Sequence, residues 1–483
     1  MSIFYRPDDG VAADFIPFYR EGEYHLFYLK DYRDAAGHGE GTPWFHLLTR
    51  DFVTFEDLGE ALARGPEGSQ DVWVFTGSAI EHEGMFHIFY TGHNGHFAGT
   101  DRPVQAVMHA TSPDLRAWTK DEGFLFVAPT DGYEKDDWRD PFVFWNDEAG
   151  EWWMLLAARR TAGPSRNRGC LALAACGGPA ASRDLKAWEV REPLWAPDLY
   201  FTHECPDCFR IGDWWYLIYS TFTERSVTHY RMSRSLAGPW LCPANDTFDG
   251  RAFYAAKTAG CCGRFAGETG ERFIFGWLPT RDGETDSGGW QWGGELVVHE
   301  LLQQSDGTLK VRAPKTVLEA FVEAVATKPS PVLGVWRAED HSVGADAVGR
   351  HSVLSLGAMP DECLIETTVE FAEETAAFGL MVRWDEGADR YYQVRFEPPN
   401  QRFVIDRWPR PGDQPFMLER PLAMRPGKPI SLRVVADGTC LVVYVNDEVA
   451  LSCRMYDQRQ GSLGLFVTEG RASFGAVGVK VRG

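Results

Sequence analysis

Three acidic residues, Asp14, Asp140 and Glu204, stand before strand-like runs in three copies of a sequence repeat. Each lies among apolar neighbours, in VAAD-FIPFY, WRD-PFVFW and FTHE-CPDCF. A carboxylate in such company is costly unless it is paired or has a function. Two carboxyl groups at one site can supply a proton donor and a nucleophile or base, which is what cleavage of a glycosidic bond requires. The alternative is structural ion pairing, for instance between Arg139 and Asp140.

The repeat consists of a glycine followed by an aromatic-rich run, and another strand-like run precedes most of these glycines. The glycines recur roughly every 60 residues, at Gly22, Gly84, Gly150, Gly212 and Gly270. Two strand-like runs joined by a short turn that contains glycine predict a β-hairpin. The sequence therefore predicts five hairpin-containing units.

The three acids occupy similar places in their units. Asp14 and Glu204 each precede the hairpin glycine by eight residues, and Asp140 precedes it by ten because its turn is longer. If this strand is the innermost one of each unit, symmetry directs the three side chains into one end of a central channel. Glu204 lies beside the apolar Cys205 and Pro206 and would face two aspartates, so it is the candidate for a raised pKa.

The elements that position these residues are all strands. Units of about 60 residues with four short strands each are typical of propeller blades, and long segments of helical period are absent. We predict an all-β chain: a five-bladed β-propeller over 1–317, a linker over 318–335 and an antiparallel β-sandwich over 336–483. In the last segment, alternating runs are separated by turn signals about every ten residues.

The amino-acid composition limits the classes of ligand that the protein is expected to bind. Aromatic residues make up 13% of the chain, including 18 Trp, and they favour strands and also form flat platforms for sugar rings. The net charge of −21 argues against nucleic acid, which requires clustered Lys and Arg. No membrane span or signal peptide is recognisable, so we expect a cytoplasmic protein that binds a small oligosaccharide or glycoside. Oligomeric state is left open.

The ten cysteines fit reduced thiols better than a disulfide framework. Cys205 and Cys208 form a CxxC pair, and Cys261 and Cys262 are adjacent, but neighbouring cysteines are a poor ligand pair for zinc. We expect no metal site and no cofactor.

Two motifs, Arg139-Asp140-Pro141 and Glu204-Cys205-Pro206, resemble those of glycoside hydrolase family 32, the invertase and fructanase family. The resemblance extends to families 43 and 68 at greater distance. It is supported by VFTGSAI around Phe75, by the TPWFHLLTRDF stretch and by the run GGWQWGGELVVHEL from Gly288. It covers most of the chain, including the C-terminal domain.

By this resemblance the protein is a retaining glycosidase of furanosides, of β-fructofuranoside type, that works by double displacement. Asp14 would be the nucleophile, Asp140 the stabiliser of the transition state and Glu204 the acid/base, with Arg139 orienting the acidic pair. The residues expected to line the sugar subsite are Trp44, Phe75, Ser78 and Trp292.

The first family motif is altered here. The family has Trp-Met-Asn-Asp-Pro-Asn-Gly, whereas this chain has Val11-Ala12-Ala13-Asp14-Phe15-Ile16-Pro17. Loss of polar groups that read hydroxyls changes substrate choice by large factors. Three alternatives therefore stay open: a glycosyltransferase, an inverting arabinofuranosidase- or xylosidase-like enzyme, and a carbohydrate-binding propeller without catalysis.

Overall fold

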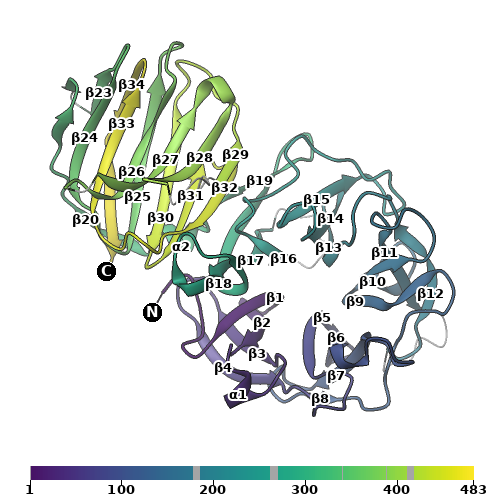
Figure 1. Ribbon diagram of the computed structural model, residues 1–483. Helices are drawn as coiled ribbons and strands as arrows, with labels where there is room; N and C mark the ends of the chain where they lie inside the picture. The colour runs from purple at the N-terminus through teal and green to yellow at the C-terminus, as the bar shows by residue number, and fades with distance from the viewer. Residues whose placement is uncertain (1, 178–184, 261–269, 340, 388, 411–417) are drawn as a thin grey trace.

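A computed structural model describes residues 2–177, 185–260, 270–339, 341–387, 389–410 and 418–483 (Figure 1). Strands dominate, which confirms the all-β prediction. The helices are short: α1 (Ala35–His38), α2 (Lys315–Glu319) and the 3-10 turns Gly95–Phe97, Asp282–Glu284 and Pro398–Asn400. Among these described residues, no helix has the length and apolar character needed to cross a membrane.

The N-terminal strands form consecutive antiparallel groups arranged around a common centre (Figure 1). The first two groups are β1 (Val11–Arg20), β2 (Glu23–Asp31), β3 (Trp44–Thr49) and β4 (Glu56–Leu62), then β5 (Trp73–His82), β6 (Met85–His93), β7 (Gln105–Ser112) and β8 (Thr119–Lys120). The next two are β9 (Tyr133–Asn146), β10 (Glu151–Arg160), β11 (Gly169–Gly177) and β12 (Glu189–Trp195), then β13 (Glu204–Ile211), β14 (Trp214–Thr221) and β15 (Val227–Ser233). The last is β16 (Tyr254–Gly260), β17 (Arg272–Arg281), β18 (Trp290–Gln303) and β19 (Leu309–Arg312).

The last group is joined to the first. β18 pairs with β1 through Ala12 and Gly294, so the two groups share one eight-stranded sheet. The number of blades therefore stays a prediction.

Four of the predicted hairpins are confirmed with their glycine turns. β1–β2, β5–β6, β9–β10 and β13–β14 are antiparallel pairs. Their turns place Gly22, Gly84, Gly150 and Gly212 at φ of 89°, 78°, 66° and 55°. Only glycine adopts this region without steric cost, which explains why the repeat is marked by glycine.

The C-terminal region consists of two antiparallel sheets that share one apolar core, as expected for a sandwich. The nine-stranded sheet contains β20 (Phe321–Val325), β22 (Trp336–Glu339), β23 (Ser342–Asp346), β25 (Cys363–Phe371), β30 (Ile430–Asp437), β31 (Cys440–Val445), β32 (Val449–Arg454), β34 (Arg471–Gly475) and β35 (Gly478–Arg482). The seven-stranded sheet contains β21 (Ser330–Leu333), β24 (His351–Ala358), β26 (Ala377–Asp385), β27 (Arg390–Glu397), β28 (Arg402–Trp408), β29 (Leu418–Pro421) and β33 (Ser462–Thr468).

The predicted linker over 318–335 is wrong in its extent. β20 pairs with β35, and β21 pairs with β24, so this segment already contributes a strand to each sheet. The residues of these strands are largely exposed because they lie at sheet edges, and their weak alternation hid them in the sequence.

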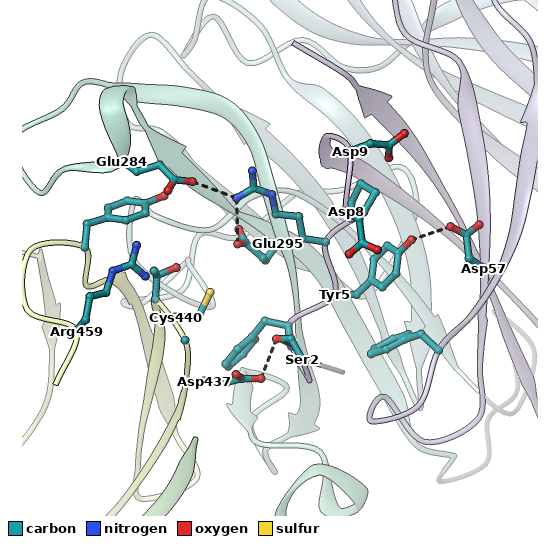
Figure 2. A pocket seen from close by; sticks show the side chains of 17 residues that line it. Ser2, Tyr5, Asp8, Asp9, Asp57, Glu284, Glu295, Asp437, Cys440 and Arg459 are labelled. Carbon is teal, nitrogen blue, oxygen red and sulfur yellow. Dashed lines mark hydrogen bonds and ion pairs between the residues drawn. The ribbon is translucent and has the colours of Figure 1, made fainter. Parts of the chain in front are cut away.

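The sandwich is anchored to the N-terminal region by buried polar contacts. Arg454 is fully buried, donates to the carbonyls of Leu278 (2.7 Å) and Pro279 (3.0 Å), and pairs with Glu295. A cavity of about 780 Å³ lies between the two regions, and Ser2, which lines it, donates to Asp437 at 2.7 Å. Figure 2 shows the side chains that line this cavity. These contacts hold the sandwich beside β18 and the N-terminus.

Candidate active site

A β-bulge interrupts the first strand of each N-terminal group. The register shifts opposite the bulged residues in β1, β5, β9, β13 and β16. The residue that opens the bulge has positive φ in four of these strands: Asp14 (45°), Asp140 (58°), Cys205 (51°) and Ala255 (50°). Bulges redirect side chains and are common beside active sites. Here they direct side chains of strands far apart in sequence toward one place.

The bulges correct the predicted equivalence of the three acids. Asp14 and Asp140 open their bulges, whereas Glu204 stands one residue earlier, before Cys205. The residues equivalent to Glu204 in the strands on either side are Arg139 and Tyr254. Glu204 thus has the cation and the phenol as lateral neighbours, and the aspartates lie in the next row.

Glu204 is held from both sides. One carboxyl oxygen accepts from Arg139 Nη2 at 3.1 Å, and the other accepts from Tyr254 Oη at 2.6 Å. Burial raises the pKa of Glu204, Arg139 opposes this rise and Asp140 adds to it. Its side chain keeps 20% of its surface exposed, so a ligand can reach it.

Asp14 is a half-buried carboxyl group with few hydrogen-bond donors. Trp277 Nε1 donates to its Oδ1 at 3.0 Å, and the thiol of Cys205 lies 3.9 Å from its Oδ2. Burial, together with the negative charge of Asp140, raises the pKa of Asp14 to about 7. Near neutral pH the group therefore stands at the midpoint of its titration.

Asp140 is fixed by backbone contacts. Its Oδ2 accepts from the backbone N–H of Cys205 at 2.9 Å, and its own N–H donates to Thr91 Oγ1 at 2.7 Å. Arg139 Nε lies 3.8 Å from the same carboxylate. The bulge of β13 thereby links Asp140, through Cys205, to both other acids.

The carboxyl groups of this site can donate and accept a proton and can form a covalent bond with a ligand at the same place. Asp14 and Glu204 both have raised pKa values, so each binds a proton more tightly than an exposed carboxyl group. One protonated and one ionised carboxyl group is the state that a double displacement at an acetal carbon requires.

Phe75 and Trp292, two of the predicted subsite residues, line a cavity of about 570 Å³. Phe75 stands before the bulge of β5 and stacks on His93 with ring centroids 4.6 Å apart. Trp292 is 38% exposed and its ring lies 6.2 Å from that of Trp277. Both are placed where a sugar could contact them.

Trp44 and Ser78 do not fit the predicted contact with a sugar. Trp44 has no exposed surface, and its Nε1 donates to the carbonyls of Val74 (3.1 Å) and Phe75 (3.2 Å). Ser78 is 1% exposed and its Oγ accepts from the N–H of Val143. Trp44 supports the strand that carries Phe75, and Ser78 links β5 to β9.

Tyr254 and Trp277 are site residues that the sequence analysis did not single out. Tyr254 lies in the FYAAKT stretch, where it has the same offset from the bulge as Arg139 and Glu204, but the bulge has no sequence signal. Trp277 lies on β17, the second strand of its group, whereas the spacing of the acids concerned only the first strand of each group. Cys261 and Cys262 lie outside the described residues, so the absence of a metal stays a prediction.

Comparison with known proteins identifies the family of the chain. A family model described as "Glycosyl hydrolases family 32 N-terminal domain" matches residues 9–313, and one described as "Glycosyl hydrolases family 32 C terminal" matches 338–481. An Escherichia coli "Sucrose-6-phosphate hydrolase" is 26% identical over 93% of this chain and 87% of its own length. An Escherichia coli "Raffinose invertase" is 26% identical over 94% of this chain and 89% of its own length.

Solved structures of similar fold extend over nearly the whole chain. Fructan 1-exohydrolase IIa from Cichorium intybus superposes with a TM-score of 0.74 at 17% identity, covering 99% of this chain and 96% of that one. The Bombyx mori β-fructofuranosidase BmSUC1 gives 0.70 at 19% identity, with 99% and 93% covered. At these identities the likeness concerns the fold.

Proposed function

The chain belongs to the glycosyl hydrolases of family 32 and is a glycosidase, and we propose that it is a retaining β-fructofuranosidase of small fructosides. The observation that carries the proposal is the row Arg139, Glu204 and Tyr254 beside Asp14 and Asp140, built by bulges in neighbouring strands. Membership of the family sets aside the non-catalytic propeller and the inverting enzyme of family-43 type.

In the first step, Asp14 attacks the anomeric carbon of the fructosyl unit while Glu204 gives its proton to the glycosidic oxygen. The bond from carbon to that oxygen breaks, the alcohol leaves, and an ester joins the sugar to Asp14. Trp277 favours the ionised form of Asp14 by donating to Oδ1, which leaves Oδ2 for the attack.

In the second step, Glu204 acts as the base. Its carboxylate takes a proton from water, the hydroxide oxygen bonds to the anomeric carbon, and the ester bond to Asp14 breaks. Fructose leaves with its configuration retained. Asp140, fixed by Cys205 N–H, would stabilise the cationic transition state and accept from a sugar hydroxyl.

Arg139 is the positioning residue of this cycle. It donates to Glu204 and also to Asp137 at 2.7 Å, and both carboxylates raise the pKa of its guanidinium. Because it is always charged, it holds Glu204 in place in both protonation states.

We further propose that the five bulged strands are the inner strands of five propeller blades. Support comes from the same bulge in β1, β5, β9, β13 and β16 and from the ring in Figure 1. Phe75 and Trp292 would contact the sugar at the mouth of the channel.

The substrate is a fructoside, but its remaining sugar differs among relatives. One Escherichia coli relative is named for sucrose 6-phosphate and the other for raffinose, at equal identity. A phosphate group on the substrate is therefore not common to the relatives of this chain.

The test is release of fructose from sucrose and raffinose by wild type and by Glu204→Gln. Loss of the acid/base should lower kcat by about 10²–10⁴-fold, while far-UV circular dichroism stays unchanged. If wild type releases no fructose, or if Glu204→Gln retains full activity, the proposal fails. Product analysis of the same reactions separates hydrolysis from transfer to a second sugar.

A further inference from the structure

The cavity beside the acids has aromatic walls. Trp73 and Phe75 from β5 and Trp292 from the start of β18 line it, together with the loop between β2 and β3. It lies beside the catalytic carboxyls, because Trp292 packs near Trp277, which bonds Asp14. On the proposed function, the sugar that leaves with the glycosidic oxygen extends into this cavity.

The charged groups of the cavity are mainly acidic. Asp31, Asp34 and Glu40 line it, against the single cation Arg33. The side chain of Glu40 is 57% exposed and that of Asp31 is 34% exposed, so both carboxylates are accessible to solvent. A phosphate brought here would meet carboxylates.

The guanidinium of Arg33 already interacts with neighbouring groups of the protein. Its Nη2 donates to the carbonyl of Trp292 at 2.6 Å, its Nη1 donates to Gln291 Oε1, and its Nε lies 3.9 Å from Asp31. These contacts fix the position of the Trp292 platform. They use one N–H of each Nη, so part of the donor capacity of the guanidinium is already taken by the protein.

Two further basic residues, His96 and Arg64, contact Glu40 and line an adjoining cavity. His96 Nε2 is 2.9 Å from Glu40 Oε2, and Arg64 Nη1 donates to the Glu40 carbonyl at 2.7 Å. Glu67 lines the same cavity. The His96 ring also packs against Trp73, with ring centroids 5.9 Å apart, so the histidine that contacts Glu40 borders the aromatic wall.

We propose that this site selects fructosides whose leaving sugar is uncharged and discriminates against those whose leaving sugar carries a phosphate. The aromatic walls stack on an unmodified sugar ring, and the three carboxylates repel a phosphate monoester, whose charge is −1.5 to −2 at pH 7. The inference rests on the proposed function and narrows its substrate class.

The experiment compares kcat/KM for sucrose and sucrose 6-phosphate at low and high salt. The expected preference for sucrose is at least about tenfold at low salt and decreases as salt screens the carboxylates. Glu40→Gln should shift the ratio toward the phosphorylated substrate by about two- to fivefold, the range for one exposed charge pair. Glu21→Gln, in the β1–β2 turn at the other end of β1, is the control that should leave both values unchanged.

Equal or faster hydrolysis of sucrose 6-phosphate would overturn the inference while leaving the proposed function intact. Arg64→Gln would then show whether that cation binds the phosphate, by a selective loss of kcat/KM for the phosphorylated substrate. Hydrolysis of neither substrate, nor of any other fructoside, would overturn the proposed function and this inference with it.

Discussion

Asp14→Asn should abolish turnover and at the same time stabilise the fold at alkaline pH. The pKa of Asp14 is raised from 3.8 to about 7 by burial and by Asp140. A raised pKa means that the folded state binds the proton more tightly than the unfolded chain, so stability is lost as pH rises from 3.8 toward 7. At 1.36 kcal/mol per pKa unit, ionised Asp14 costs about 4 kcal/mol above pH 7.

Asparagine suits the position. It tolerates the left-handed backbone that Asp14 adopts at φ 45°, and its side-chain oxygen can still accept from Trp277. The assay is urea unfolding of wild type and variant at pH 4, 6 and 8, followed by tryptophan fluorescence, with Glu21→Gln as the exposed control. The stabilisation should be near zero at pH 4 and grow to about 1–4 kcal/mol at pH 8. A variant that is less stable than wild type at pH 8, or a difference that does not change with pH, would refute the reasoning.

Three further predictions follow from single contacts. Tyr254→Phe removes a donor that lowers the pKa of Glu204, so the alkaline limb of the kcat/KM profile should move to higher pH, whereas an unchanged profile would contradict the contact. Arg454→Met removes the buried partner of Glu295 at the domain interface, leaving only Arg6 at 3.7 Å, and should destabilise the protein by about 3–5 kcal/mol in the same urea assay; a loss below 1 kcal/mol would be inconsistent with a buried pair. Burial lowers the pKa of His46 to about 3, so wild type should lose stability as pH falls below 6.5, and His46→Gln should remove about 1.4 kcal/mol per pH unit of this slope; an unaltered slope would show that His46 is not the group responsible.

The hairpins could be predicted from sequence because a turn with positive φ restricts residue type. Glycine at Gly22, Gly84, Gly150 and Gly212 is a local requirement, so its recurrence marks the repeat. Clustering of Asp14, Asp140 and Glu204 could also be predicted, since all three precede such hairpins. The sequence could not predict which of the three acids opens a bulge and which lies one residue before it. The four residues that open bulges with positive φ are Asp, Asp, Cys and Ala, so this backbone conformation is not marked by one residue type.

The predicted sugar-binding residues show that resemblance to a family motif does not establish which side chains a ligand can reach. Trp44 and Phe75 both come from family-like segments, yet only Phe75 lines the cavity. Trp44 instead donates a hydrogen bond to the backbone carbonyl of Phe75. Ala13, which replaces an asparagine of the first family motif, is fully buried. Such differences depend on packing between groups of strands, which a repeat within one strand does not encode.

The most direct test of the account is to trap the sugar on the enzyme. A fructoside with a good leaving group needs little help from Glu204 in the first step, but Glu204→Gln lacks the base for the second, so the covalent intermediate should accumulate. Proteolysis and mass spectrometry should then find a fructosyl ester on the peptide that carries Asp14. An adduct on another residue, or continued hydrolysis by Asp14→Ala, would contradict the assignment of Asp14 as the nucleophile.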